Sequence, residues 1–367
     1  MSTLLIFIGV LAVLVLAHEF GHFSLARKFG VKVNEFGVGF PPRLFGWRRG
    51  ETLYTINLIP LGGFVKIKGE SGEFAEDQDS FAHKPVWQRS LILVGGVSMN
   101  FILATVLLSV GLMFGLPQVT ENLPANAKVK DHKVQIMSVL TNSPAAEASL
   151  QLGDEIYQIN NESITNVSQV QEIIGASQGE EITINTRRGQ EERDVVVSPI
   201  ILNETNGYGI GVALVSTGIV SYPWYSAFYR GAVDTGLMTK EIVVAFYQLL
   251  NNLITKQSLG MDISGPVGIA VITGQVAKLG FVYLLQFAAL LSINLAVINV
   301  LPFPALDGGR LVFVLAEKLR RGKSISRKLE AIVHNIGFLF LIGLVIAVTY
   351  RDIVRYGGQI FGAIFNS

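Results

Sequence analysis

The sequence has no cysteine and few charged residues. Because none of its 367 residues is cysteine, disulfide bonds are excluded, and any metal site must use histidine, aspartate or glutamate. Only 16% of the residues are charged and 50% are hydrophobic, a composition too apolar for an ordinary soluble protein. The net charge of +1 favours neither nucleic acid nor any other strongly charged partner. We therefore expect a protein of the lipid bilayer that binds no nucleic acid.

Long hydrophobic runs predict four transmembrane helices. At 1.5 Å per residue, a run of about 20 residues crosses the roughly 30 Å hydrocarbon core of a bilayer. The apolar stretch at residues 234–254 is interrupted by Lys240, Glu241 and Gln248, which is typical of a helix lying in the membrane interface. No basic residue precedes the first run, which favours an uncleaved first span over a signal peptide cleaved near Ala17. The four predicted spans are residues 4–27, 91–116, 281–301 and 332–350.

Basic residues are unevenly distributed among the segments that join these spans. Ten lie at positions 27–89 and seven at 310–328, whereas the 159 residues at 117–275 contain nine basic and sixteen acidic residues. Basic residues near the ends of spans are retained in the cytoplasm. The first two segments are therefore predicted to be cytoplasmic, and the long segment and both termini extracytoplasmic. We interpret the basic residues at 318–328 as an orientation signal that contacts anionic lipid.

The long outer segment has the features of a small α+β domain. Residues 134–140 and 182–186 have the composition of β-strands. The stretch at 143–156, followed by Ile159 and Asn160, resembles the helix-turn-strand signature of PDZ domains. We expect one PDZ domain at residues 120–210 and no second copy.

A glycine-rich region follows the first span on the predicted cytoplasmic side. Its polar and apolar residues alternate at positions 31–68, which predicts membrane-proximal β-hairpins. The predicted fold is a polytopic α-helical membrane protein with four transmembrane helices, membrane-proximal β-hairpins and an inserted α+β PDZ domain. Its expected parts are an N-terminal membrane core at 1–116, the PDZ domain at 120–210, an interfacial amphipathic helix with a connecting segment at 211–275, and a C-terminal membrane core at 276–367.

The first predicted span carries the motif His18-Glu19-Phe20-Gly21-His22. His18 and His22 are four residues apart, so they share one helix face and can reach the same ion, with Glu19 beside them. Ionisable side chains at the bilayer centre cost roughly 3 kcal/mol each on insertion scales, so three within two turns need a compensating role. Zinc binding supplies such a role. The alternative is that the three side chains hydrogen-bond to one another or lie at the hydrated end of the helix.

A catalytic zinc ion needs a third protein ligand, and Asp307 is the best candidate. It follows the third span, where Pro302 and Pro304 end the helix and the two glycines after Asp307 allow close backbone approach. The predicted topology places Asp307 on the same cytoplasmic side as His22. An aspartate before two glycines is also commonly a turn residue.

Together these motifs resemble the site-2 protease family of intramembrane zinc metalloproteases. The resemblance rests on the histidine motif in the first span, on Leu306-Asp307-Gly308 after an Asn-x-x-Pro-x-Pro stretch, and on the PDZ domain between them. Residues 59–66 and 264–269 also resemble family segments that flank the catalytic core. The bacterial branch that regulates sigma factors fits best. The resemblance implies a multi-pass protein of the bacterial cytoplasmic (inner) membrane whose metal site lies near the cytoplasmic side.

The resemblance also implies a role for each matching residue. His18, His22 and Asp307 become the ligands of one zinc ion per chain, and Glu19 becomes the general base. The substrate is expected to bind in an extended form, paired by β-addition. Its expected contacts are Asn299, Gly62, Gly63, Phe64 and Val65. Expected substrates are single-span membrane proteins such as anti-sigma factors, already cleaved by another protease, or remnant signal peptides.

Two features depart from the family pattern. Val97 stands where the family often has a proline in the second span, and valine does not impose the kink that proline does. Some relatives carry two PDZ domains and this chain carries one, so its screening of substrates by size is expected to differ. The remaining histidines, His83, His132 and His334, are assigned no metal role.

The favoured hypothesis is an intramembrane zinc endopeptidase that takes part in regulated intramembrane proteolysis. A rival is a PDZ-based membrane scaffold with a non-catalytic metal site, and zinc content together with cleavage would separate the two. A metal or proton transporter is disfavoured, because spans two to four lack aspartate, glutamate and lysine in their apolar interiors.

Overall fold

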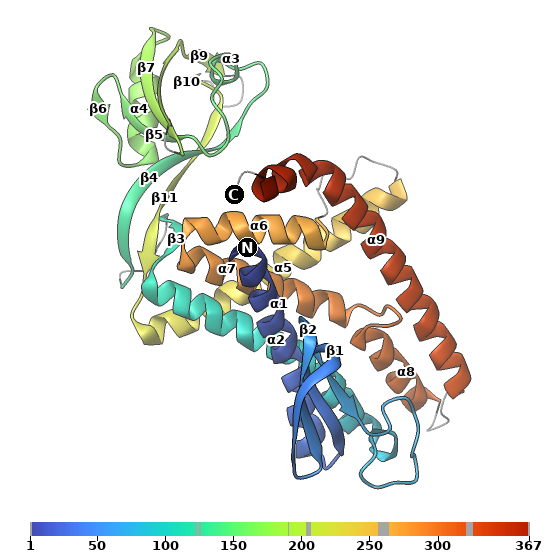
Figure 1. Cartoon of the computed structure of the whole chain (residues 1–367). Helices are drawn as coiled ribbons and strands as arrows, with labels where there is room; N and C mark the ends of the chain where they lie inside the picture. The colour runs from blue at the N-terminus through green and yellow to red at the C-terminus, as the bar shows by residue number, and fades with distance from the viewer. Residues whose placement is uncertain are drawn as a thin grey trace. The chain divides into compact units, whose positions relative to one another are not determined.

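The computed structural model contains two compact units (Figure 1). It describes residues 2–121, 123–124, 126–189, 191–202, 207–255, 264–320 and 326–365. The helical unit comprises Met1–Gly111 and Phe228–Ser367, and the β-rich unit comprises Leu112–Ala227. Parts of several predicted segments lie outside the described residues, namely 122, 125, 190 and 203–206 of the PDZ domain, 256–263 of the connecting segment and 321–325 of the basic segment.

Four helices in the described part of the chain are long and apolar enough to cross a membrane. They are α1 (Ser2–Lys28), α2 (Val86–Phe114), α7 (Phe281–Val300) and α9 (Arg327–Phe365). All four predicted spans fall on these helices. Helix α2 ends two residues earlier than predicted, because Gly115 has a φ of 110° that a helix cannot continue through.

Two further long helices follow the β-rich segment and precede α7 in the chain. Helix α5 (Trp224–Thr255) contains the stretch predicted to lie in the membrane interface. Helix α6 (Pro266–Leu279) is a 14-residue apolar helix that contacts α1, α7 and α9. The sequence analysis did not predict α6, because 14 residues are too few to stand out as a span. The backbone N–H of Gly268 in its first turn donates to the carboxylate of Asp352 in α9, at 2.7 Å.

Strands β1 (Val33–Arg49) and β2 (Thr52–Ile67) form an antiparallel sheet in the region predicted to contain hairpins. Both strands are long, and β2 pairs with β1 along two different stretches. Residues 35–38 pair with residues 53–56 on one side and with residues 63–66 on the other. The stretch at 63–67 is therefore an outer edge of this sheet, with no further strand paired to it among the described residues.

A hydrophobic cluster joins this sheet to the helices. Val33 and Ile67 from the strands, Ile92 from α2 and Val314 from α8 (Asp307–Leu319) are buried together in it. This cluster fixes α1, α2, the sheet and α8 against one another. Its buried member from α1 is Ala26, four residues after His22.

The main antiparallel sheet of the β-rich unit has the strand order β3-β11-β4-β5-β7-β8, with β6 paired to β5, and β9 and β10 form a separate two-stranded sheet. Helix α4 (Val167–Ala176) is capped at its N-terminus by Asn166, whose side chain accepts a hydrogen bond from the N–H of Gln169. Alternate strand residues such as Val134, Ile156 and Ile184 form the buried core. The predicted strands at 134–140 and 182–186 correspond to β4 and β7. The other elements are β3 (Leu116–Val119), β4 (Lys128–Val139), α3 (Pro144–Glu147), β5 (Glu155–Ile159), β6 (Glu162–Ser163), β7 (Ile182–Arg188), β8 (Glu191–Val197), β9 (Ile200–Leu202), β10 (Gly207–Gly209) and β11 (Val212–Ser221).

The compact unit is wider than the domain predicted at residues 120–210. Strand β3 begins at Leu116, and β11 continues to Ser221 and pairs with both β3 and β4. These pairings extend the unit on both sides of the predicted boundaries, which remain a prediction for the PDZ domain itself.

Candidate metal centre

Helices α1 and α2 cross in backbone contact at glycines. A Cβ atom added to Gly95 would lie 2.9 Å from the carbonyl oxygen of Gly21, and one added to Gly21 would collide with the carbonyl oxygen of Gly95. A Cβ atom at Gly96 would lie 2.8 Å from Cε1 of His18 and would collide with Nε2 of His22. The missing side chains therefore create the space in which the two imidazole rings pack against α2.

The chain turns back sharply after α7, and this turn places Asp307 at the start of α8. A Cβ atom at Gly308 would collide with the carbonyl oxygens of Val300 and Leu301, and one at Gly309 with the carbonyl oxygen of Phe303. The glycine pair thus permits the close backbone approach expected from the sequence. In the first turn of α8, the carboxylate of Asp307 is also favoured by the helix dipole.

Three side chains meet where these elements converge. Oδ2 of Asp307 lies 3.0 Å from Nε2 of His18 and 3.3 Å from Nε2 of His22, and the two Nε2 atoms are 3.1 Å apart. A tetrahedral zinc ion with ligand bonds of about 2.0–2.1 Å separates its ligand atoms by about 3.3–3.4 Å. The three atoms thus form a triangle close in size to one face of such a tetrahedron. A fourth position remains for water or substrate.

The buried polar atoms also fit a metal ion. Oδ2 of Asp307 is buried and makes no hydrogen bond of acceptable geometry to the described residues, which is costly for a carboxylate without a cation. Nδ1 of His22 lies 2.8 Å from the carbonyl oxygen of Ile92, an acceptor that requires a proton on Nδ1 and leaves Nε2 free as a ligand. Both histidines are buried, as an ordered ligand pair requires.

Electrostatics favour a charged carboxylate in this cluster. Burial raises the pKa of the Asp307 carboxyl, but the close contacts of its Oδ2 atom with the imidazoles of His18 and His22 lower that pKa by more and hold it well below its usual range. Glu19 is half-buried on α1 and interacts electrostatically with all three of these side chains. A carboxylate that is not itself part of the ligand triangle therefore lies beside it.

The other histidines lie elsewhere. Within the described part of the chain, His18, His22 and Asp307 form the one group of three or more side chains placed to share a metal ion. His83 is exposed and bonds to the carbonyl oxygen of Ala75, at 3.0 Å, and His132 is exposed on β4. Nδ1 of His334 accepts a hydrogen bond from the N–H of Ala305, at 2.9 Å.

The predicted substrate-contact residues fall into two places. Gly62 and Gly63 lie against α1, where added Cβ atoms would be 3.2 Å from Val15 and 3.0 Å from Leu16. Val15 is four residues before Glu19 and therefore on the same helix face. Phe64 stacks on Phe40 and lies under the amine of Lys66, while Val65 packs against the buried cluster of the helical unit. Asn299 is the half-buried penultimate residue of α7.

Comparison with known proteins matches the model of peptidase family M50 to residues 6–344. The chain belongs to peptidase family M50. Regulator of sigma-W protease RasP from Bacillus subtilis is 33% identical over a 439-residue alignment that covers 96% of this chain and 99% of the relative. Zinc metalloprotease RasP from Geobacillus kaustophilus is 32% identical, with 97% and 99% covered. The resemblance to site-2 proteases is thus confirmed.

This M50 member is an intramembrane zinc metalloprotease, and zinc is its cofactor. The rival hypothesis of a scaffold is not favoured by these relatives. Among solved structures, the PDZ domain of the SdrC-like protein from Listeria monocytogenes is 26% identical, covers 24% of this chain and 92% of its own, and has a TM-score of 0.22.

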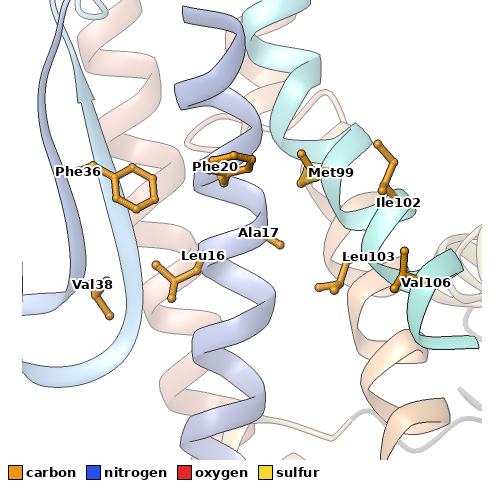
Figure 2. Close-up of a pocket in the computed structure, with 9 residues that line it drawn as sticks. All are labelled: Leu16, Ala17, Phe20, Phe36, Val38, Met99, Ile102, Leu103 and Val106. Carbon is orange, nitrogen blue, oxygen red and sulfur yellow. The ribbon is translucent and has the colours of Figure 1, made fainter. Parts of the chain in front are cut away.

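A separate apolar groove of about 480 Å³ lies beside the histidine helix. Figure 2 shows Leu16, Ala17 and Phe20 of α1 between the side chains of β1 and those of α2. Phe20 is two residues from each histidine and therefore points to the opposite side of the helix. The groove contains no exposed polar surface, which suits a membrane-embedded face, and it does not include the metal ligands. Its other lining residues are Phe36, Val38, Met99, Ile102, Leu103 and Val106.

Sequence reasoning missed the partners of the imidazole rings. The carbonyl of Ile92, the bare backbone of Gly96 and the amide of Asn100 all come from α2. The available signal was the spacing of Gly96 and Asn100, four residues apart on one face of an apolar helix.

Proposed function

We propose that His18, His22 and Asp307 hold the zinc ion and that Glu19 is the general base of an endopeptidase that cleaves transmembrane segments of membrane proteins. The observation that carries this proposal is the triangle of ligand atoms, with sides of 3.0, 3.1 and 3.3 Å. Its two imidazoles and one carboxylate match the donor set of catalytic zinc, which keeps one position open.

The chemistry assigned to the protein side chains follows from this arrangement. When bound, zinc supplies the Lewis acidity that polarises the scissile carbonyl and lowers the pKa of water to about 7. The Glu19 carboxylate takes a proton from the attacking water and then delivers it to the leaving amine. Gly96 holds both imidazole rings against α2, which keeps the two nitrogen ligands fixed during the reaction.

Substrate backbone is held by the outer edge of the sheet at residues 63–67. Among the described residues no further strand pairs with that edge, so its N–H and C=O groups can take part in strand addition. Gly62 and Gly63 bring the edge against the face of α1 that carries Glu19. Asn299 contacts the same extended segment from the end of α7. A helical substrate must unwind before it can pair in this way.

The surrounding topology is part of the proposal. The protein lies in the bacterial cytoplasmic membrane, with its termini and one PDZ domain at residues 120–210 outside and the metal site near the cytoplasmic side. The distribution of basic residues supports this orientation. Substrates are single-span proteins first shortened by another protease, either anti-sigma-like proteins or remnant signal peptides. The name of the Bacillus subtilis relative, a regulator of sigma-W protease, supports the first class.

The test replaces Glu19 with glutamine in the full-length protein. Purified Glu19→Gln should hold one zinc ion per chain, by elemental analysis, and lose at least about 100-fold in cleavage of a model single-span substrate, in line with the loss of a general base. Glu51→Gln is the matched control, because the Glu51 side chain is 70% exposed at the turn between β1 and β2. Full cleavage by Glu19→Gln would remove Glu19 from the mechanism, and stoichiometric zinc in His22→Ala would overturn the ligand set.

A further inference from the structure

Asn100 is a fully buried amide that contacts one of the imidazole rings. Its Nδ2 atom lies 3.3 Å from Nδ1 of His18, and its buried Oδ1 atom has no hydrogen-bond partner among the described residues. Its backbone carbonyl accepts a hydrogen bond from the hydroxyl of Ser292 in α7, at 2.8 Å. The residue is therefore held in place by the backbone, while its amide is only partly satisfied.

The orientation of this amide decides which nitrogen of His18 is free. With the NH2 group facing Nδ1, that nitrogen must be the acceptor, so a neutral ring carries its proton on Nε2. Nε2 is the atom that faces Asp307 and His22, and a protonated nitrogen cannot bind a metal ion. A half-turn of the amide brings Oδ1 to Nδ1, and the proton then belongs on Nδ1.

The second histidine already shows the arrangement that zinc requires. Nδ1 of His22 faces the carbonyl oxygen of Ile92 at 2.8 Å, an acceptor that cannot exchange its role. Ile92, Gly96 and Asn100 are spaced at four-residue intervals along α2, so they form one stripe on the helix facing the metal cluster. His18 lacks a backbone acceptor of this kind in the described structure and faces a side-chain amide instead.

We propose that Asn100 is a positioning residue for the metal site, whose Oδ1 accepts the Nδ1–H of His18 and so fixes the tautomer that presents Nε2 to zinc. It acts through His18 and touches neither the ion nor the substrate. Partners of this kind orient metal-bound imidazoles and raise their basicity. This inference rests on the proposed function only in taking His18 as a ligand.

The test compares two replacements in the full-length protein in detergent, with the zinc dissociation constant measured by chelator competition. Asn100→Leu keeps the branched shape of the side chain and removes the acceptor, so zinc should bind 10–100-fold more weakly, whereas Asn100→Asp keeps an acceptor oxygen and should stay within about threefold of wild type. Ser109→Ala is the control, because Ser109 is another buried polar residue of α2 and its hydroxyl donates to the carbonyl of Thr105 in the same helix.

The outcomes separate this inference from the ligand assignment. Zinc affinity of Asn100→Leu within about threefold of wild type would overturn the role of the amide, since loss of such a partner costs 10–100-fold. Equal weakening in Asn100→Leu and Asn100→Asp would also overturn it, because the effect would then follow packing and not the acceptor. The variant His18→Ala tests the ligand set separately. If His18→Ala retains zinc, the proposed ligand set is wrong. If His18→Ala loses zinc while Asn100→Leu retains it, only the positioning role of Asn100 is wrong.

Discussion

Replacing Gly96 with alanine should damage the metal centre although no ligand is changed. The new Cβ atom would lie 2.8 Å from Cε1 of both His18 and His22, which is 0.6 Å inside the 3.4 Å at which ordinary contact begins. Helix α2 has little room to retreat, because its backbone at Gly95 already touches that of Gly21 in α1. The imidazole rings must therefore move.

The size of the effect follows from this required movement. Distances between a metal ion and its ligands stay within about ±0.2 Å of their preferred values. A displacement of the imidazole rings by several tenths of an ångström therefore disturbs the metal site. Overpacking a tight interior costs about 1–3 kcal/mol. If that strain falls on the zinc-bound arrangement, zinc affinity drops by roughly 5- to 150-fold, because about 1.4 kcal/mol corresponds to a tenfold change.

The assay is chelator competition on Gly96→Ala, together with cleavage of the model membrane substrate at saturating zinc. Gly9→Ala is the matched control, since Gly9 also lies in a membrane helix and a Cβ atom there meets nothing within 4 Å. That control should bind zinc as the wild type does. Unchanged zinc affinity in Gly96→Ala would refute the packing of the imidazole rings on the bare backbone of α2.

Two further predictions concern buried carboxylates away from the metal. Burial raises the pKa of Asp154, but its hydrogen bonds with Arg188, at 2.6 and 2.8 Å, lower that pKa by more. The pair therefore stabilises the β-rich unit fully above about pH 4, the pKa of aspartate in the unfolded chain. This stability is lost as the pH falls through the lowered pKa of the folded state. Asp154→Asn should thus melt at a lower temperature than wild type at pH 7 and show a smaller difference at pH 3; equal melting temperatures at pH 7 would contradict this. Asp352→Leu should cost about 1–3 kcal/mol in unfolding free energy, because the N–H of Gly268 in α6 loses its buried acceptor. Asp352→Asn, which keeps an oxygen acceptor, should recover most of that loss, and an equal loss in both variants would argue against the hydrogen bond.

Local patterns explain what could be predicted from the sequence. The four spans could be recognised because length and hydropathy are properties of one segment, independent of its neighbours. His18 and His22 could be paired because helical spacing alone puts them on one face. Asp307 could be joined to them only by the charge asymmetry and the family motif, and the structure brings its Oδ2 within 3.0 Å of His18.

Packing between distant segments could not be predicted in the same way. Glycine pairs are common in membrane helices, so nothing in the sequence indicated that Gly21 would face Gly95. The contact of Asn100 with His18 depends on how α2 is rotated about its own axis, which an almost uniformly apolar helix does not reveal. Residues 35–38 pair on both sides with different parts of β2, which leaves residues 63–67 at the edge of the sheet. This arrangement depends on the pairing register, which the alternation of polar and apolar residues does not determine.

The free edge at residues 63–67 can bind a partner through its backbone N–H and C=O groups, so binding depends little on the partner's side chains. A membrane segment can pair there only after its own N–H and C=O groups have left their helical partners, and each unpaired group costs several kcal/mol in hydrocarbon. Residues with low helix propensity reduce this cost, glycine by about 1 kcal/mol relative to alanine. If the substrate binds by strand addition as proposed, the peptide bonds that are cut lie where its transmembrane helix unfolds most easily. The choice of cleavage site then depends on local helix stability, so proteins with unrelated sequences can be equivalent substrates.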